Sequence, residues 1–206
     1  MRRRPTAHDE GFTLVEVVVA ISLVVVVALS LGAFAVQGMR LATDQQRAHL
    51  AVTVATERMD HVHRLTTSNA QLAALVAGRT SATVNAEWTA AAGVPGVATT
   101  HPAWASVPGG TASIPLVQTV TRNGTQFRSV VLIGTCYQAI GGGDCARIGG
   151  SAVDPGETSP AALGRSRLIR TIVTVTYPGS CDGGDICRYT ASGLFDTKGD
   201  LTWRTD

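Results

Sequence analysis

Glu16 stands directly before the longest uncharged segment of this 206-residue chain. No charged residue occurs from position 17 to position 39, and the next basic residue, Arg40, lies about six helical turns further on. A carboxylate at the centre of a bilayer costs about 2.5–3.5 kcal/mol unless it is paired, and somewhat less near the membrane edge. The sequence therefore predicts that a cation from outside this segment pairs with Glu16.

The segment after Glu16 is long enough to cross a membrane. Residues 17–36 read VVVAISLVVVVALSLGAFAV, and a helix of this length spans about 30 Å, the thickness of the hydrocarbon core. Valine and isoleucine favour strands, but a lone strand leaves its backbone unpaired in lipid, so a helix is expected. Arginines at positions 2–4 precede the run. The positive-inside rule then predicts a single pass with a cytoplasmic N-terminus and an extracytoplasmic remainder.

The residues around Glu16 carry a family resemblance. The hexapeptide Gly-Phe-Thr-Leu-Val-Glu at residues 11–16, between a short basic leader and an apolar helix, resembles the class III signal of type IV prepilins and pseudopilins. The resemblance implies that residues 1–11 form a leader peptide, which a prepilin peptidase removes by cutting between Gly11 and Phe12. It further implies that this enzyme methylates the new amino group of Phe12, and that Glu16 pairs with that amine on a neighbouring subunit.

The resemblance also implies partners and a location. The partners are the prepilin peptidase, other pilin or pseudopilin subunits, an inner-membrane assembly platform and membrane lipid. The chain is stored in the cell membrane and reaches the pilus surface after assembly. Many major pilins carry a proline about two-thirds along the apolar helix, where this chain has Gly32-Ala33, and this departure favours a minor pilin or pseudopilin.

Two other interpretations of the N-terminus remain open. One is a plain signal anchor that carries an exported binding module or enzyme and never enters a filament. The other is a cleaved secretory signal, for which Ala33-Phe34-Ala35 supplies a small-residue cleavage site. Against the second, the apolar run exceeds the 7–15 residues typical of a signal-peptide core, and Glu16 stands at its start.

The rest of the composition argues against several function classes. A formal net charge of +2 and an aromatic content of 5 % are too small for a nucleic-acid binder. No local Ser/His/Asp or Cys/His grouping and no phosphate-binding loop occurs in the sequence. We therefore expect a structural subunit rather than an enzyme, with no cofactor and no metal. In this interpretation the chain is the substrate of the processing enzyme and catalyses no reaction itself.

All four cysteines follow the apolar segment, on the predicted extracytoplasmic side, where disulfides persist. Three pairings are possible. We favour the local pairs Cys136–Cys145 and Cys181–Cys187, because each closes a glycine-rich loop at the end of a strand. A zinc site is the alternative, but neither spacing matches a zinc knuckle.

A few other residues invite a ligand interpretation. Asp182, Asp185, Asp196 and Asp200 surround turns, and calcium binding there stays open, although the spacing is not that of an EF-hand. The histidines at positions 49, 61 and 63 are interpreted as packing or solvated residues. Asn123 begins an Asn-Gly-Thr glycosylation sequon, but a hairpin turn explains the same residues.

The chain is expected to place these residues on one long helix and one sheet. Residues 12–39 form the membrane-spanning or filament-core half of the helix, and residues 40–206 form the extracytoplasmic domain. The helix continues over residues 40–65, where an apolar stripe recurs at three- and four-residue steps. The stripe comprises Ala48, Val52, Ala55, Met59 and Val62.

A sheet is predicted within residues 114–204. Strands at 116–122 and 125–135 flank Asn123-Gly124, a type I′ hairpin signal that sets Val120 opposite Phe127. Further strands are expected at 168–177, 188–195 and 201–204, a short helix at 69–77, and loops at 93–115 and 141–164. The predicted fold class is α+β, a pilin-like long N-terminal helix packed on a small antiparallel sheet.

Overall fold

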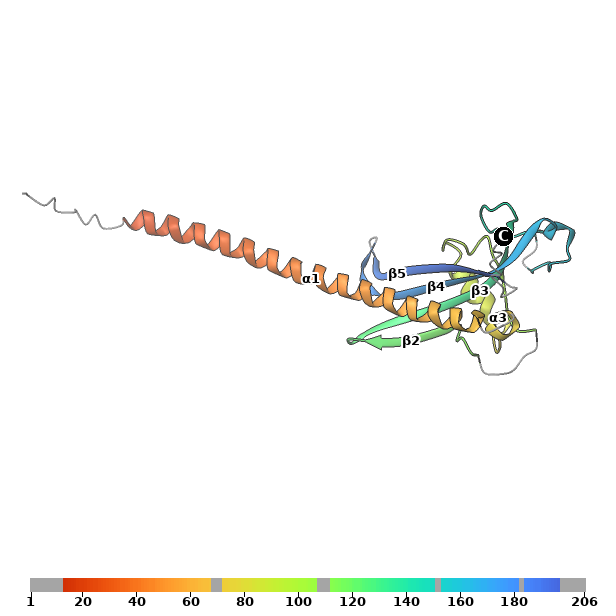
Figure 1. Cartoon of the computed structure of the whole chain (residues 1–206). Helices are drawn as coiled ribbons and strands as arrows, with labels where there is room; N and C mark the ends of the chain where they lie inside the picture. The colour runs from red at the N-terminus through yellow and green to blue at the C-terminus, as the bar shows by residue number, and fades with distance from the viewer. Residues whose placement is uncertain (1–12, 68–71, 107–111, 151–152, 182–183, 197–206) are drawn as a thin grey trace, which may run out of the picture. The chain divides into compact units, whose positions relative to one another are not determined.

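A computed structural model describes residues 13–67, 72–106, 112–150, 153–181 and 184–196 (Figure 1). The chain divides into two compact units, Met1–Gln45 and Gln46–Asp206. The helix α1, Leu14–Thr67, contributes to both units. The other elements all belong to the second unit: α2 (Leu72–Leu75), α3 (Ser81–Ala90), β1 (His101–Pro102), β2 (Val117–Arg122), β3 (Thr125–Ala139), the 3-10 turn η1 (Pro160–Ala162), β4 (Arg165–Cys181) and β5 (Gly184–Asp196).

The first unit contains the apolar half of α1. Within the described chain, α1 alone is long and apolar enough to cross a membrane, judged by length and composition. Residues 14–43 are all exposed in the isolated chain. The hydroxyls of Ser22 and Ser30 donate to the carbonyls of Val18 and Val26, each at 2.8 Å. These bonds satisfy the hydroxyls within the helix, so neither needs a partner in lipid.

The second unit is built on a five-stranded antiparallel sheet. The strand order is β1-β3-β4-β5. β2 is the hairpin partner of β3 and pairs with the edge of β3 that also pairs with β1. Asn123 (φ 49°) and Gly124 (φ 73°) form the turn between β2 and β3, and Val120 is paired with Phe127. This hairpin follows the predicted register, because both turn residues adopt the positive φ that a type I′ turn requires.

The second half of α1 packs on one face of the sheet, which confirms the predicted α+β architecture. Ala51, Val54, Ala55 and Val62 are buried against strand residues that include Phe127, Val131 and Val173. The predicted stripe was wrong at Val52, which is 38 % exposed. Ala51, Val54 and the predicted Ala55 stand at i, i+3 and i+4, so they share the face that meets the sheet, and Val52 lies outside this face.

The opposite face of the sheet is covered by an element that the sequence analysis did not predict. The helix α3 is capped by Thr80, whose hydroxyl accepts from the Thr83 amide at 3.3 Å. Its last turn and the loop after it form a second buried cluster on β3 and β4. The cluster contains Ala91, Val94, Val97, Val130, Leu132 and Ile172, with Trp88 and Leu116 packed against it.

The strand β1 lies in a stretch predicted to be loop, so that prediction was wrong at two residues. His101 pairs with Thr135 and Pro102 with Gly134. A Cβ atom at Gly134 would lie 2.2 Å from the carbonyl oxygen of His101. The missing side chain is therefore what allows the two backbones to approach and pair.

The remaining elements differ from their predicted bounds chiefly in length. β3, β4 and β5 extend beyond the predicted ranges and include three of the four cysteines; Cys145 lies outside them. α2 covers residues 72–75 of the predicted 69–77 helix, and residues 69–71 lie outside the described part. The predicted edge strand at 201–204 also lies outside it.

Candidate processing and assembly site

The N-terminus of α1 is capped by Thr13. Its hydroxyl accepts from the Glu16 amide at 3.3 Å, and its carbonyl accepts from the amides of Glu16 and Val17 at 3.0 and 3.2 Å. Thr13 and Glu16 have the Ser/Thr-x-x-Glu spacing of a capping box, in which the glutamate occupies the third helical position. The sequence analysis missed this role of Thr13, although the spacing alone would have revealed it.

Glu16 lies in the first turn of α1 and is exposed. A negative charge there is favourable because it faces the positive end of the helix dipole. Within the described residues its carboxylate has neither a hydrogen bond nor an ion pair to a side chain, so the charge is available to another chain. Gly11 and Phe12, the residues at the expected cleavage point, lie outside the described residues.

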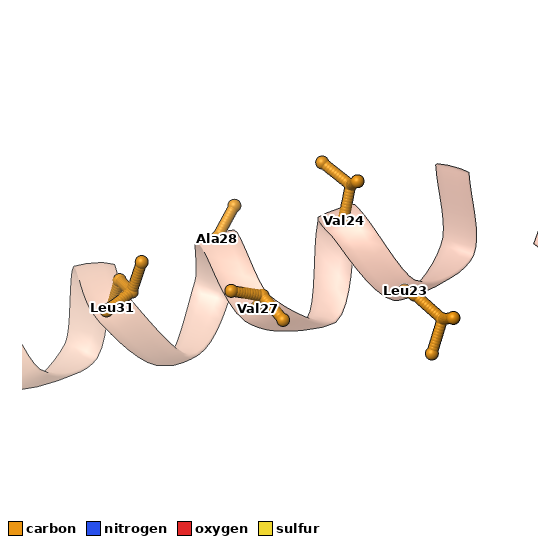
Figure 2. A pocket seen from close by; sticks show the side chains of 5 residues that line it. All are labelled: Leu23, Val24, Val27, Ala28 and Leu31. Atoms are coloured by element: carbon orange, nitrogen blue, oxygen red, sulfur yellow. The ribbon is translucent and has the colours of Figure 1, made fainter. Parts of the chain in front are cut away.

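The exposed half of α1 offers an apolar surface for lipid or for other helices. Leu23, Val24, Val27, Ala28 and Leu31 line a shallow groove along one side of the helix (Figure 2). These side chains follow each other at steps of one and three residues, and smaller alanine and valine side chains lie between the leucines. The groove contains no charged side chain, as an environment of hydrocarbon or apolar helices requires.

Two disulfides stabilise the second unit, Cys136–Cys145 and Cys181–Cys187. They are the two local pairs favoured from the sequence. Cys181–Cys187 joins β4 to β5 near their connecting turn, and Cys136–Cys145 ties the end of β3 to the loop that follows. Among the described residues, no group of three His, Cys, Asp or Glu side chains is placed to hold a metal ion.

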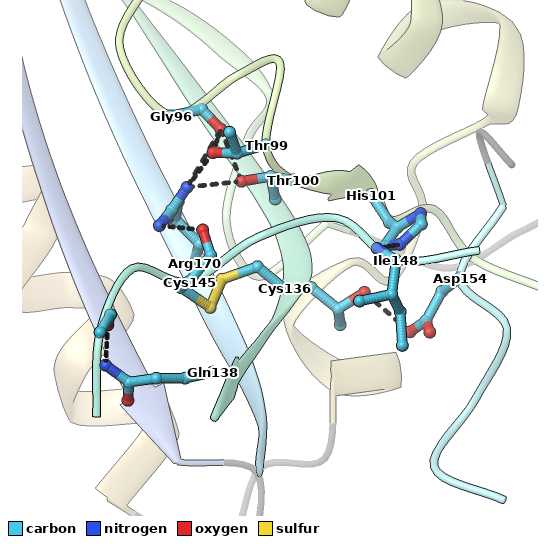
Figure 3. The surroundings of a disulfide bond; sticks show 12 residues. Gly96, Thr99, Thr100, His101, Cys136, Gln138, Cys145, Ile148, Asp154 and Arg170 are labelled. Atoms are coloured by element: carbon cyan, nitrogen blue, oxygen red, sulfur yellow. Dashed lines mark hydrogen bonds between the residues drawn. A yellow bond between two sulfur atoms is a disulfide. The ribbon is translucent and has the colours of Figure 1, made fainter. Parts of the chain in front are cut away.

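Arg170 connects the first disulfide loop to the loop before β1. Its guanidinium donates to the Cys145 carbonyl at 3.0 Å, the Thr99 hydroxyl at 2.6 Å and the Gly96 carbonyl at 3.2 Å (Figure 3). Burial lowers the pKa of Arg170, and the nearby Asp144 carboxylate opposes that effect. One β4 side chain therefore holds two irregular segments against the outer face of the sheet.

Asp154 performs a similar task for the loop between β3 and β4. Its carboxylate accepts from the Thr135 hydroxyl at 2.7 Å, the Tyr137 hydroxyl at 2.5 Å, the Gly156 amide at 2.9 Å and the Arg167 Nε at 2.8 Å. Burial by itself would raise the pKa of Asp154, but these donors outweigh it and lower the pKa to about 2. Burial and the bond to Asp154 raise the pKa of Tyr137 to about 12.

Arg79 anchors the segment that leads into β2. Only 3 % of the residue is exposed. Its guanidinium donates to the Ile114 carbonyl at 2.9 Å and to the Val131 carbonyl at 2.8 Å. Burial lowers its pKa to about 10, so the group stays charged near neutral pH. The sequence analysis singled out none of Arg79, Asp154 and Arg170, because their partners are far away along the chain.

The candidate ligand residues show structural contacts. His61 Nε2 lies 3.0 Å from the Ser113 carbonyl, and the His63 ring packs against Phe195 with centroids 5.8 Å apart. Asp182 and Asp200 lie outside the described residues, so the turns proposed for calcium are only partly described.

Comparison with known proteins identifies the N-terminus. Residues 7–32 match the family described as the prokaryotic N-terminal methylation motif. Neither a curated protein nor a solved structure matches the chain. The family match includes Gly11, Phe12 and Glu16 and ends within the apolar half of α1. The N-terminal segment is therefore a class III prepilin signal, which marks a type IV pilin-like precursor that a prepilin peptidase processes.

Proposed function

We propose that the chain is a minor pilin or pseudopilin, a structural subunit of a type IV pilus or of a type II secretion-like filament. The observation that carries the proposal is the combination of a methylation motif at residues 7–32 with a helix whose apolar half is exposed over residues 14–43. A membrane can store such a helix, and a filament core can bury it. The lack of a proline in the apolar helix favours the minor or pseudopilin role.

Cleavage between Gly11 and Phe12 supplies the cation that Glu16 lacks. Removal of residues 1–11 leaves Phe12 with a free ammonium four residues before Glu16. In the proposed filament this ammonium pairs with Glu16 of a neighbouring subunit. Burial of both charges is tolerable only when the two chains are in register, so the pair selects alignment more than it adds stability. The contact is head-to-tail and unclosed, which generates a helical assembly.

Intact-mass analysis of the chain from its native membrane tests the processing step. The expected mass is that of a chain beginning at Phe12 with one added methyl group. A chain that retains Arg2–Arg4, or one that begins near Val36, contradicts the proposal and supports a plain anchor or a cleaved secretory signal.

A Gly11→Val variant provides the matched control. The β-branched side chain prevents the close approach of the peptide to the protease, so this variant is expected to keep the full precursor mass. The same mature mass from Gly11→Val and from the unsubstituted chain would show that processing does not depend on Gly11, which contradicts the proposed recognition.

A further inference from the structure

Among the described residues, one long edge of the strand β5 has no pairing strand. The strand has 13 residues and contains neither proline nor lysine. Its ladder with β4 is regular from Ile186 to Asp196. Within the described part of the chain, β4 alone pairs with β5. Native proteins normally shorten, bend or charge such an edge, because its free amides and carbonyls are a template for another strand.

In the described part of the chain, the strand β2 forms the second edge without a partner, on the opposite side of the sheet (Figure 1). Among the described residues it pairs with β3 alone. Three antiparallel steps separate β2 from β5, through β3 and β4. β2 and β5 therefore run in opposite directions, and two copies in the same orientation bring β5 of one beside β2 of the other as an antiparallel pair.

One register of the two edges places exposed apolar side chains opposite each other at the start of β2. Val117 is 37 % exposed and Leu194 is 45 % exposed. Both lie on the face of the sheet away from α1. Val117 pairs with Val130 and Leu194 pairs with Arg170, and the side chains of Val130 and Arg170 lie on the face that α3 and the loop after it cover. When Val117 lies opposite Leu194, these two exposed apolar side chains cover each other.

The same register gives favourable pairs at three further β2 residues. On the outer face, Thr119 lies opposite Ser192 and Thr121 lies opposite Thr190, and hydroxyl pairs of this kind stabilise antiparallel strands. On the other face, Val120 lies opposite Ala191. A shift of two residues places Val117 opposite either Ser192 or Asp196, which leaves the apolar pair unmade.

A cavity beside Val117 provides room for the incoming leucine. It measures about 420 Å³ and lies between α3 and the start of β2, where Thr83, Ala86, Leu116 and Val117 form part of its wall. Arg79 also lines it and holds the chain just before β2 in place through the Ile114 carbonyl. Glu87 and Gly78 also line the cavity, so the apolar part of the wall is the part beside Leu116 and Val117, where a leucine side chain from a neighbouring edge strand would lie.

We propose that β5 of one copy pairs antiparallel with β2 of a second copy, with Leu194 opposite Val117, so that the sheet continues from subunit to subunit. The inference rests on the proposed function, because anchoring in one membrane gives neighbouring copies a common orientation. An antiparallel β5–β5 pair would instead relate the two copies by a two-fold axis.

Cysteine cross-linking of the full chain in its native membrane tests the pairing. A Thr119→Cys chain and a Ser192→Cys chain, each with its own affinity tag, are produced together. Directly opposite residues have Cα atoms about 4.5–5.5 Å apart, within the range of a disulfide. We expect a linked dimer that contains both tags. The off-register combination of Thr119→Cys with Thr190→Cys should stay unlinked, because diagonal neighbours lie about 7–8 Å apart.

A second pair of variants tests the leucine contact. Leu194→Lys should abolish the link, because a charged side chain would replace the apolar contact with Val117 and lose water on strand pairing. Ile186→Lys, at a residue that is 70 % exposed and outside the pairing segment 189–194, should leave it unchanged. Both side chains are exposed in the single chain, so neither change should alter the melting temperature of the full chain.

Three results would overturn the pairing. The first is a link of Ser192→Cys with itself, which indicates β5–β5 contact. The second is a link in the off-register combination that equals the link in register. The third is the lack of any link in both the membrane and the filament fractions. The mature mass and filament incorporation of the same chains report separately on the proposed function. A chain that is processed and incorporated without forming the link refutes only the pairing.

Discussion

Asp154 shows how a single carboxylate holds a long irregular segment in place. Four donors from two strands and its own loop converge on it, including Tyr137 and Arg167. Because these donors favour the ionised form, the folded chain keeps Asp154 charged at pH values where an unfolded chain would protonate it. The stability of the second unit therefore depends on pH in the acid range.

An Asp154→Asn variant tests this dependence. The pKa of Asp154 falls from 3.8 to about 2 on folding. The contribution is therefore fully present above about pH 5 and is lost as the pH falls through the folded value. The shift corresponds to about 2 kcal/mol. Denaturant unfolding of the full chain in detergent at pH 7 and pH 2.5 should show a smaller loss of stability for Asp154→Asn than for the unsubstituted chain.

The control for this measurement is Asp60→Asn, at an exposed α1 carboxylate. This variant removes one surface carboxylate and keeps the contacts of Asp154, so it measures the effect of a lost surface charge alone. If Asp154→Asn also keeps the full pH dependence, the acid sensitivity arises from other groups.

Glu16 is the residue on which the proposed assembly depends most. A Glu16→Gln variant keeps the size and hydrogen-bonding capacity of the side chain and removes its charge. We expect normal cleavage and methylation, because the cut precedes residue 16 by four peptide bonds, but a strong loss of filament incorporation relative to the membrane pool. Glu16→Ala should behave alike. Normal incorporation of Glu16→Gln would show that the charge has no role in register.

At the scale of elements, α1 meets two different environments along its length. Residues 14–43 expose apolar side chains in all directions, whereas the part within the second unit has one buried stripe and one polar side. The exposed polar side carries Glu57, which forms an ion pair with Arg122 of β2 at 3.2 Å. A surface pair of this kind contributes little to stability, so the buried stripe must supply most of the attachment to the sheet.

Val54 and Val52 form a matched pair for testing this attachment. Val54 is 1 % exposed and faces the sheet, whereas Val52 is 38 % exposed. Val54→Ala removes buried methyl groups and leaves a cavity, so the free energy of unfolding should fall by about 2 kcal/mol. Val52→Ala should change it by less than about 0.5 kcal/mol. Thermal or denaturant unfolding of the full chain in detergent measures both, and equal effects would contradict the observed burial.

At the scale of the whole molecule, the two units carry different kinds of information. The first unit contains the part matched by the methylation-motif family, and residues 7–32 account for the precursor and its processing. The second unit contains the sheet, both disulfides and, among the described residues, two sheet edges without a partner strand. If the first unit supplies the filament core, the second unit supplies the surface by which neighbouring subunits recognise one another.

What the sequence alone determined is local along the chain. The prepilin signal at residues 11–16 is a linear motif, so its expected processing can be predicted without knowledge of the fold. The β2–β3 turn follows from Asn123-Gly124, and the favoured cysteine pairs join residues only nine and six positions apart. In each of these cases the residues that interact are close in sequence, and their types restrict the geometry.

What only the tertiary structure decided depends on contacts between distant residues. Arg79 reaches β3 across 52 positions, and Arg170 reaches the loop before β1 across 74. The position of α3 on the outer face, the burial of Val54 in place of Val52 and the two open sheet edges have the same origin. Local propensity cannot reveal them, because a side chain's partner and a strand's free edge exist only once remote segments have packed together.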